Sequence, residues 1–492
     1  MKRFITFALF LSIYILTTYA SAEYNCYGVV VGKDASTSGK VIMGHNEDDS
    51  GPQVVNHHKI PRIIHEPGEK VTLLNGGQLD QTDTTWAYIW SEMPGMRFSD
   101  AYVNEWGVAI ASDACPSCED KPELTDGGIS YMLRRLVAER SKSSREGVHL
   151  AGELVERFGY DASGRTYLIT DADEGWLFCA VNGKHWLAAR VPDDKVAIIA
   201  NTYSVREVDL SDTVNFLAAD DIIKYAIDRD WYDPKISGEF DFARVYSNPS
   251  VAADSANFCR QWGGLRHVAA DSIPLQQDLP FSVKPKAKSN IFSVMMILRD
   301  HYEDTDLYAA DSVTGCPHQT GVRSICTETT RNSVVIQYRD VDTIELDPAI
   351  YWVSLGRPCT SPFVPFYVSI TNFPPGYSSR WDAPSEEFIR KMIEEPVLDF
   401  DAAHDGFWNF IKLDHKFCRS YSEVSPKVIE IISSFEQHAI AEQVELEKKI
   451  SDLLANNAGL SNQDHGFQNL LLKYSSTFFI APMEELARLK VR

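Results

Sequence analysis

Short apolar runs separated by polar clusters fill the segment between residues 26 and 115. The runs are CYGVVVG, KVIMGHN, TWAYIW and AYVNEWGVAIAS, and Gly, Asp, Ser and Thr gather between them. Apolar, β-branched and aromatic runs bounded in this way are typical of β-strands. Similar runs recur over 165–190 and 195–201 and between 290 and 355, so we expect a chain rich in strands.

Apolar residues also recur at helical spacing between these groups of strands. On residues 128–143, one helix face would carry Ile129, Met132, Leu133, Leu136 and Val137. Residues 149–158 are predicted to be helical as well. Strands, then helices, then strands again predict an α+β chain with sheets covered by helices, rather than an all-β domain.

The C-terminal region, residues 376–492, is predicted to be mainly helical and to pack on the preceding domain. Ser425 is a suitable N-cap and Pro426 a suitable first helical residue, and 427–456 has helical periodicity. A further helical stretch is expected to close the chain. We interpret this region as a cover rather than a catalytic unit.

The N-terminus has the pattern of a secretory signal peptide over residues 1–22. Lys2 and Arg3 precede an apolar run over 4–16, and Ala-Ser-Ala at 20–22 fits the small-x-small cleavage rule. We expect a soluble mature protein that is secreted, periplasmic or in another extracytoplasmic compartment. The alternative, a lipid anchor on Cys26, is disfavoured because Glu-Tyr-Asn at 23–25 lacks the small and aliphatic residues of a lipobox.

Charge and cysteine content further restrict the classes of partner and the thiol chemistry that the protein can have. The 492 residues carry a formal net charge of −22, which argues against nucleic-acid partners and against binding to anionic membranes. No later segment is apolar for long enough to span a membrane. Nine cysteines leave at least one thiol outside any set of disulfides.

Cys26 opens the first strand of a predicted hairpin. Residues 26–32 form one strand, 33–39 the loop and 40–47 the other strand. The expected register places Cys26 opposite Asn46, and the surrounding polar residues would be His45, Asn46, Glu47 and Asp48. A strand end buried for packing alone does not normally collect such a cluster, although Cys26 as a plain strand residue or disulfide partner is the competing interpretation.

Removal of residues 23–25 after signal cleavage would make Cys26 the N-terminal residue. A free α-amino group has a pKa of about 7.7–8.0 and can act as general base for the side chain of its own residue. A thiol is already a strong nucleophile. One residue would then supply nucleophile and base, and we expect autocleavage between Asn25 and Cys26 to expose it.

The cysteine after a short leader, followed by GHNEDD, resembles a family of cysteine-type N-terminal-nucleophile dipeptidases, which includes PepD-type dipeptidases and secernins. That family is distantly related to penicillin V acylases and bile salt hydrolases. The segments YVNEWGVAIAS, YLITDADEGWLFCAVNGKHWLAARVPDDKVAIIAN, DFARVYS, LRDHYEDT and YWVSLGRPCTSPFVPFY carry the same resemblance. It covers residues from about 26 to 370.

The resemblance implies a four-layer αββα hydrolase domain over 26–375. It also implies hydrolysis of an amide C–N bond through a thioester. Carried over by position, the catalytic residues are Cys26, Asp48, Asn104 and Asn201. The acylase branch has arginine where this chain has His45, which favours the dipeptidase branch, and a later arginine of that branch matches either Arg244 or Arg260.

Other polar residues have plainer interpretations. Asn104 could be a turn residue and Asn201 a strand stop, while Asp171 and Asp173 are predicted to form a hairpin turn. His57, His58 and His65 have no ligand spacing and are assigned to loops. Zinc could use Cys115-Pro-Ser-Cys118 or Cys316-Pro-His318, but disulfides are the simpler account, so we expect no metal and no cofactor.

Three functions follow in order. The first is an exported cysteine dipeptidase that acts on dipeptides or small peptides. The second is an N-acyl amide hydrolase of penicillin V acylase or bile salt hydrolase type. The third is a non-catalytic protein of the same fold. The sequence leaves open whether the chain is a homo-oligomer.

Overall fold

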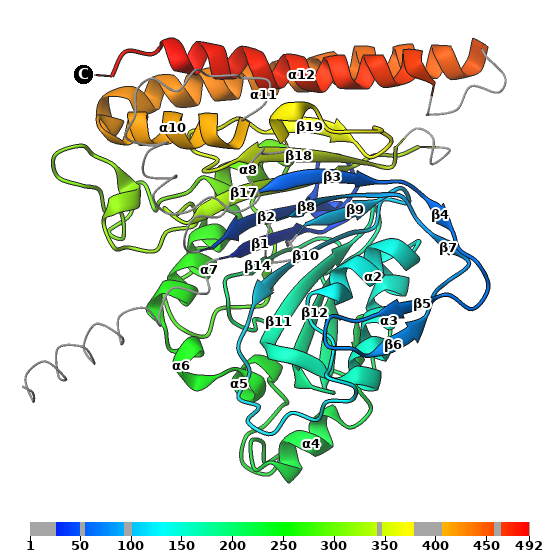
Figure 1. Cartoon of the computed structure of the whole chain (residues 1–492). Helices are drawn as coiled ribbons and strands as arrows, with labels where there is room; N and C mark the ends of the chain where they lie inside the picture. The colour runs from blue at the N-terminus through cyan, green and yellow to red at the C-terminus, as the bar shows by residue number, and fades with distance from the viewer. Residues whose placement is uncertain are drawn as a thin grey trace, which may run out of the picture.

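The structure, a computed structural model, describes residues 26–49, 55–92, 101–341, 347–377, 406–456 and 464–491 (Figure 1). The predicted signal peptide and the leader at 23–25 lie outside the described residues. So does most of the segment that would join the two predicted regions near residue 376.

The two strands predicted around Cys26 lie inside a seven-stranded antiparallel sheet. Its strands in spatial order are β16 Ser282–Val283, β14 Val196–Ile199, β1 Tyr27–Val31, β2 Ile42–Asp48, β17 Thr330–Tyr338, β18 Ala349–Leu355 and β19 Val364–Tyr367. Every residue of β1 and β2 is buried. The valine-rich sequence of β1 is typical of a strand covered on both faces.

The central part of the chain forms an eight-stranded antiparallel sheet. Its strands in spatial order are β15 Phe216–Ala218, β13 Trp186–Arg190, β12 Gly175–Gly183, β11 Tyr160–Thr170, β10 Ala109–Ala114, β9 Tyr102–Asn104, β8 Tyr88–Glu92 and β3 Asn56–Ile60. Two small ribbons pair β4 Ile63–Ile64 with β7 Thr84–Thr85 and β5 Lys70–Thr72 with β6 Gln78–Asp80.

The two large sheets approach each other closely at two glycine residues. A Cβ added to Gly28 would lie 2.9 Å from a methyl carbon of Leu168 on β11, and one added to Gly175 would lie 2.5 Å from Val30. Larger residues at either position would push the sheets apart, because a packed interior tolerates little extra volume. The glycines therefore set how closely β1 approaches the second sheet.

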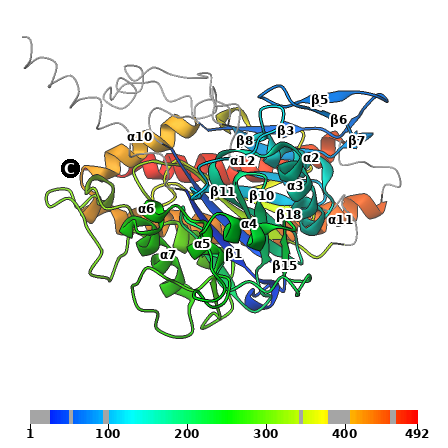
Figure 2. The same ribbon diagram turned by 90° about the horizontal axis from the view of Figure 1, so that it is seen from below.

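Helices cover the outer faces of both sheets. The helices before the C-terminal region are α2 Met132–Arg140, α3 Ser144–Phe158, α4 Ile222–Asp228, α5 Phe242–Tyr246, α6 Pro249–Ala252, α7 Ser255–Val268 and α8 Ile291–Leu298. Helices α2 and α3 pack on β9 to β13, whereas α7 contacts β14 and α8 contacts β2 and β17. Figure 2 shows α7 and β1 from below.

The described residues of the C-terminal region form three helices: α10 Gly406–Cys418, α11 Tyr421–Asn456 and α12 His465–Arg488. They contact β18 and β19 at one edge of the first sheet (Figure 1). The predicted start of the long helix is wrong, because Ser425 and Pro426 lie inside α11. The bend after α10 already supplies the first carbonyl oxygen, that of Ser420, which accepts from the N–H groups of Glu423 and Val424.

The predicted α+β class with a helical C-terminal region is confirmed. Within the described ranges, none of the helices has the length and apolar character needed to cross a membrane.

A buried ion pair ties the C-terminal helices to the first sheet. Arg299, at the end of α8, donates to both carboxylate oxygens of Glu436 on α11, and the two side chains are 4% and 1% exposed. Glu436 also accepts from the N–H of Phe363, which precedes β19, at 2.8 Å. Removing one member of such a pair leaves the other charge buried and uncompensated.

We expect Glu436→Ala to lower the free energy of unfolding by about 3–5 kcal/mol, because Arg299 would keep its charge without a partner. Guanidinium denaturation followed by circular dichroism measures the loss. Glu430→Ala is the matched control on the same helix. Its exposed pair with Lys427 predicts a change below about 1 kcal/mol. Equal effects of the two variants would show that the buried pair does not hold the helices.

Candidate active site

Cys26 lies directly before β1 and is 8% exposed. Tyr27 pairs with Asn46 in the observed register, so the next pair brings Cys26 opposite Glu47. The expected pairing of Cys26 with Asn46 is therefore wrong by one residue. The observed loop runs from residue 32 to residue 41 and includes a 3₁₀ turn at Lys33–Ala35, so it is longer than the predicted loop over 33–39.

This shift of one residue decides which side chains of β2 face which layer. The Asn46 amide donates to the carbonyl oxygens of Leu298 and Ile325, at 2.9 and 3.0 Å, and so faces α8. His45 faces the second sheet, where its Nε2 lies 3.1 Å from Oδ1 of Asp113 on β10. The two neighbours thus serve opposite faces of the strand.

Arg260 on α7 is the cation that contacts Cys26. Its side chain is fully buried, and Nη1 donates to the carbonyl oxygen of Cys26 at 3.0 Å. Nη2 donates to Oδ1 of Asn201 and to Oδ1 of Asn257, each at 2.8 Å. Of the two candidate arginines, the structure thus brings Arg260 to Cys26. The side chain of Arg244 is 64% exposed and pairs with Asp278.

Asn201 lies two residues past the end of β14. The register of β14 with β1 pairs Ile199 with Gly28, which directs Asn201 toward Cys26. Its φ of 56° is left-handed, a conformation that asparagine tolerates better than most residues. The amide donates to the carbonyl oxygen of Ala114 at 3.0 Å while accepting from Arg260. Asn201 is thus a strand stop that also contacts the arginine.

The Asp48 carboxyl is buried at the end of β2. Oδ1 accepts from Oγ1 of Thr327 at 3.0 Å and from Oγ1 of Thr330. Oδ2 is buried and has no hydrogen-bond partner among the described residues. Burial raises the pKa of this carboxyl to about 6, although the two hydroxyls and the charge of Arg260 oppose the rise. The thiol of Cys26 lies 3.7 Å from the backbone oxygen of Asp48.

A second cation, Arg323, adds positive potential near this group. Burial, together with the charge of Arg260, lowers the pKa of its guanidinium to about 10. Arg323 pairs with Asp254, the N-cap of α7, at 3.1 Å. A thiol beside the buried Arg260 can act as a nucleophile, because positive charge favours the thiolate.

The structure does not bring Asn104 to Cys26. Its amide nitrogen donates to the carbonyl oxygens of Ala138 and Ser141, at 2.9 and 2.8 Å, and its Oδ1 accepts from the N–H groups of Trp106 and Val108. Asn104 thus closes the turn between β9 and β10 and binds the end of α2. These contacts match the alternative interpretation of Asn104 as a turn residue.

Several residues of the site had no clear signal in the sequence. Thr327 and Thr330 reach Asp48 from the start of β17 and the residues before it, far along the chain, and Asp113 reaches His45 from the other sheet. Asn257 is different, because it precedes Arg260 by one helical turn on a segment with helical spacing. An Asn and Arg at this spacing could have been identified as a pair.

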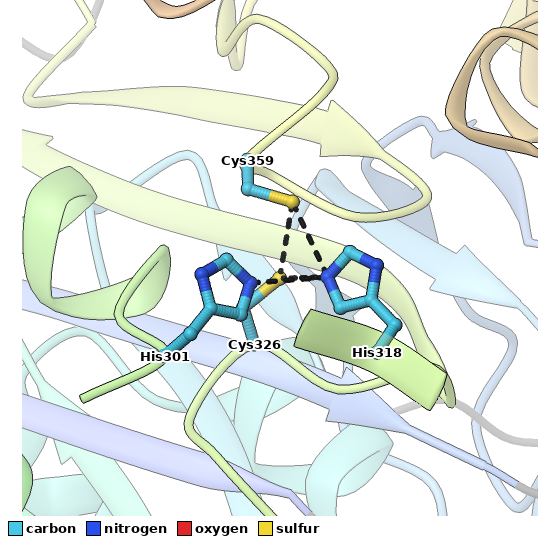
Figure 3. A group of neighbouring side chains, drawn as sticks. All are labelled: His301, His318, Cys326 and Cys359. Carbon is cyan, nitrogen blue, oxygen red and sulfur yellow. Dashed lines mark hydrogen bonds between the residues drawn. The ribbon is translucent and has the colours of Figure 1, made fainter. Parts of the chain in front are cut away.

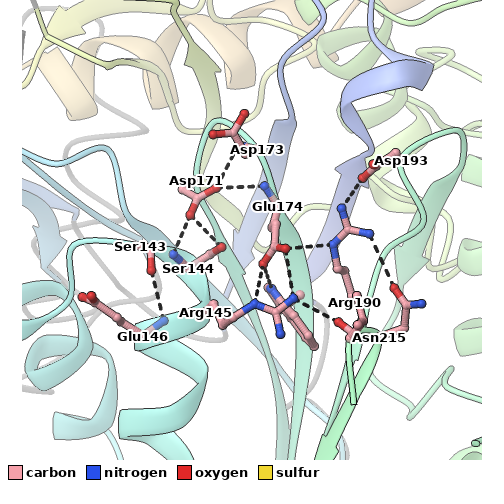
Figure 4. Close-up of polar contacts among 12 residues, drawn as sticks. Ser143, Ser144, Arg145, Glu146, Asp171, Asp173, Glu174, Arg190, Asp193 and Asn215 are labelled. Atoms are coloured by element: carbon pink, nitrogen blue, oxygen red, sulfur yellow. Dashed lines mark hydrogen bonds and ion pairs between the residues drawn. The ribbon is translucent and has the colours of Figure 1, made fainter. Parts of the chain in front are cut away.

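The acidic cluster Asp171–Asp173 forms the predicted hairpin turn between β11 and β12 (Figure 4). Oδ1 of Asp171 accepts from the N–H groups of Asp173 and Glu174, both at 2.8 Å. Its Oδ2 accepts from the N–H and hydroxyl of Ser144 at the start of α3. The cluster is structural.

The cysteine and histidine interpretations need correction. Cys316 is in a disulfide, with Cys418, but Cys115 and Cys118 are free thiols, so the disulfide interpretation is wrong for the Cys115–Cys118 motif. His57 and His58 lie in strand β3 rather than in a loop. Burial among aromatic rings lowers the pKa of His57 to about 3, and the residue packs as a neutral ring.

The raised pKa of Asp48 predicts a pH-dependent stability. The folded chain binds this proton more tightly than the unfolded chain, whose Asp pKa is about 3.9. The protonated Asp48 carboxyl therefore contributes to the free energy of unfolding fully below pH of about 4. This contribution is lost as the pH rises through about 6.

For the form that still carries residue 25, we expect Asp48→Asn to raise the free energy of unfolding by about 2–3 kcal/mol above pH 6, because it removes a buried charge. The gain should disappear near pH 4. Denaturation at a series of pH values measures it, and Asp34→Asn at an exposed position is the control. A gain that is constant with pH would contradict the assignment.

Relatives of known sequence support a shared family. "Probable dipeptidase B" from Streptococcus pyogenes serotype M6 is 25% identical over 473 residues, which cover 90% of this chain and 89% of that protein. "Probable dipeptidase" from Latilactobacillus sakei is 26% identical over 357 residues, with 70% and 74% covered. The corresponding protein of Salmonella dublin is 26% identical over 373 residues, with 71% and 82% covered.

Two solved structures show weak similarity to this chain. Penicillin V acylase from Agrobacterium tumefaciens is 16% identical, covers 70% of this chain and 86% of its own, and has a TM-score of 0.34. A mutant of conjugated bile acid hydrolase from Clostridium perfringens is 13% identical, with 67% and 89% covered and a TM-score of 0.32. TM-scores this low do not by themselves establish a shared fold.

The sequence profile of Peptidase family C69 matches residues 25–389, which include Cys26, Asp48, Asn201 and Arg260. The matched range begins one residue before Cys26 and contains both large sheets. The chain therefore belongs to peptidase family C69, a family of peptide-bond hydrolases.

Proposed function

We propose that this protein is an exported cysteine dipeptidase whose nucleophile is Cys26, exposed as the N-terminal residue by removal of residues 1–25. The observation that carries the proposal is the convergence on Cys26 of Arg260, Asn201 and Asp48. These groups come from separate elements, and each is buried. The relatives named as probable dipeptidases favour dipeptides as the substrates.

In the proposed reaction, the α-amino group of Cys26 takes the thiol proton and Sγ attacks the peptide carbonyl carbon. The negative charge that develops on the carbonyl oxygen is stabilised by preorganised N–H donors. The C–N bond then breaks, and the proton passes from the α-amine to the leaving amine. Water, deprotonated by the same α-amine, attacks the thioester and releases the acid and the free thiol.

Asn201 is the side-chain donor that we assign to the oxyanion. One of its two amide hydrogens is used by the carbonyl oxygen of Ala114, and we assign the other to the substrate. Arg260 holds Oδ1 of Asn201 at 2.8 Å and thereby sets which way the amide hydrogens point. Asn104, whose contacts lie at the end of α2, is not assigned this role.

Asp48 is assigned to the α-amine. Its buried Oδ2 lacks a hydrogen-bond partner among the described residues, and a buried carboxylate oxygen normally has one. An ammonium group formed at Cys26 would provide that partner and would lower the pKa of the carboxyl. We assign His45 a supporting role, because its contact with Asp113 on β10 holds β2 against the second sheet.

Two further parts of the proposal concern architecture and location. The two facing sheets with helices on their outer sides fit the αββα order of N-terminal-nucleophile hydrolases, and we propose that architecture. The disulfide Cys316–Cys418 supports an oxidising compartment outside the cytoplasm, in agreement with the signal-like N-terminus.

The test of this function is dipeptide hydrolysis by the purified chain, its N-terminus identified by intact mass. We expect a mature form that begins at Cys26, and Cys26→Ala should lower kcat by about a thousandfold or more, because the nucleophile is lost. Cys179→Ser, at an equally buried cysteine of β12, is the control and should keep its activity.

The same experiment distinguishes the proposed function from its alternatives. Hydrolysis of N-acyl amides but not of dipeptides would favour an acylase. Full activity of a form that begins at Glu23 would refute the α-amine as base. A chain that begins at Cys26 and hydrolyses neither substrate class would indicate a non-catalytic protein.

The two arginines provide a second test. We expect Arg260→Lys to lower kcat/KM for a dipeptide by about a hundredfold, because a lysine cannot contact Cys26, Asn201 and Asn257 at once. Arg244→Lys, in an exposed pair, should leave kcat/KM unchanged. Steady-state kinetics decide between them, and a loss confined to Arg244→Lys would reverse the assignment.

A further inference from the structure

Four potential metal ligands meet at a buried point away from Cys26 (Figure 3). They are His301, His318, Cys326 and Cys359, and each offers one ligand atom within 4.8 Å of the other three. All four side chains are buried, with at most 6% exposed. Three of them come from the long connection between α8 and β17, and Cys359 comes from the loop after β18.

The distances between these atoms fit a tetrahedral ion. The two sulfurs are 3.6 Å apart, and Nε2 of His318 lies 3.4 Å from Cys359 Sγ and 3.7 Å from Cys326 Sγ. The two Nε2 atoms are 3.0 Å apart. Zinc bonds of about 2.3 Å to sulfur and about 2.0 Å to nitrogen give tetrahedron edges of about 3.8 Å between sulfurs, about 3.5 Å between sulfur and nitrogen and about 3.3 Å between nitrogens.

The outer contacts turn both imidazoles in the direction that an ion requires. Nδ1 of His301 lies 2.8 Å from Oε1 of Glu303, and Nδ1 of His318 lies 3.8 Å from Oδ1 of Asp414. For His301, the carboxylate at Nδ1 leaves Nε2 as the coordinating atom, which is the usual arrangement of metal-bound histidine. Nδ1 of His318 also lies 3.5 Å from Sγ of Cys418, and its Nε2 faces the thiols of Cys326 and Cys359. Both rings therefore present Nε2 to the common centre.

We propose that His301, His318, Cys326 and Cys359 form a structural Cys₂His₂ zinc site. Two thiolates and two imidazoles form a complete set for a tetrahedral zinc ion, with no open position for a water. The neighbouring Cys316 and Cys418 are not ligands, because they are bonded to each other. Cys418 lies on the Nδ1 side of His318, at 3.5 Å.

The competing arrangement is a second disulfide, between Cys326 and Cys359. A disulfide requires sulfurs about 2.05 Å apart, whereas these lie 3.6 Å apart. It would also leave no reason for two imidazoles to converge on the same sulfurs. Zinc accounts for all four side chains, and bound thiolates would be protected from oxidation in an oxidising compartment.

An ion can reach this site from a neighbouring cavity. The cavity has a volume of about 620 Å³, and its lining includes His301, Cys359, Glu303 and Tyr421. Glu303 adds a negative charge on the route, which favours a cation. A buried site with an adjoining opening can be loaded after the chain has folded.

The zinc site is connected to the proposed catalytic group through one loop. Cys326 is followed directly by Thr327, whose hydroxyl donates to Asp48, and Thr330 donates to the same carboxyl. Ile325, directly before Cys326, accepts from the amide of Asn46 on β2. An ion at Cys326 therefore holds the loop that positions Asp48.

The first test is metal analysis of the full-length chain, purified without chelator from cells supplied with zinc. Inductively coupled plasma mass spectrometry should find about one zinc ion per chain. X-ray absorption at the zinc edge should give two sulfur and two nitrogen ligands. Zinc well below a tenth of an ion per chain, or a mass that shows a Cys326–Cys359 disulfide, would overturn the proposal.

Variants assign the ion to these residues. Cys359→Ser and His301→Gln should each lower the zinc content at least about tenfold, and Co²⁺ added to these variants should lack the thiolate charge-transfer band that the unaltered chain shows. The matched controls are Cys179→Ser and His57→Gln, which change equally buried residues outside the cluster. Unchanged zinc in both ligand variants would refute the site.

If a ligand variant fails to fold, the decision rests on the unaltered chain alone, through its zinc content and absorption spectrum. Dipeptide hydrolysis is measured separately, so loss of the zinc proposal and loss of the proposed function are distinguishable. In the folded variants we expect a lower melting temperature and a lower kcat, because the loop that holds Asp48 loses its anchor.

Discussion

The fully buried guanidinium of Arg260 is the constraint on which the candidate site depends. A charge out of contact with water must be met by hydrogen-bond acceptors, and the acceptors here include the backbone oxygens of Cys26 and Ala256 and the side-chain oxygens of Asn201 and Asn257. To meet it, Asn201 takes a left-handed conformation at the end of β14, and α7 presents Asn257 one turn before the arginine. The same cation therefore holds both the backbone of Cys26, the proposed nucleophile, and the amide that we assign to the oxyanion.

Asp48 is held by segment 327–330, which ends at the first residue of β17, the strand that pairs with β2. Two threonine hydroxyls from 327–330 donate to one of its oxygens, while the other is buried without a hydrogen-bond partner among the described residues. The proposed zinc ion sits at the base of this segment. Thr327 lies in the segment before β17, and segments outside regular structure are more mobile. A metal ion at Cys326 would restrict this segment and with it the position of the Asp48 carboxyl.

Much of the fold follows from local pattern. The strands around Cys26, the helices α2 and α3 and the Asp171 turn were predictable, because alternation, helical spacing and turn residues act over a few positions. The errors are also local in origin. The hairpin register differs from the predicted one by one residue, over a loop that is longer than predicted. The helix α11 starts earlier than predicted because the bend after α10 supplies the first acceptor.

The sequence by itself determined the strand order near the N-terminus, the proximity of Cys26 to Asp48 and the family, since each depends on residues close together or on a long shared pattern. Only the tertiary structure decided between Arg244 and Arg260, separated Asn104 from Asn201 and assembled His301, His318, Cys326 and Cys359. Those relations join segments far apart in the chain. Their spacing along the sequence carries no distance information, because sheet pairing and helix packing set which of them meet.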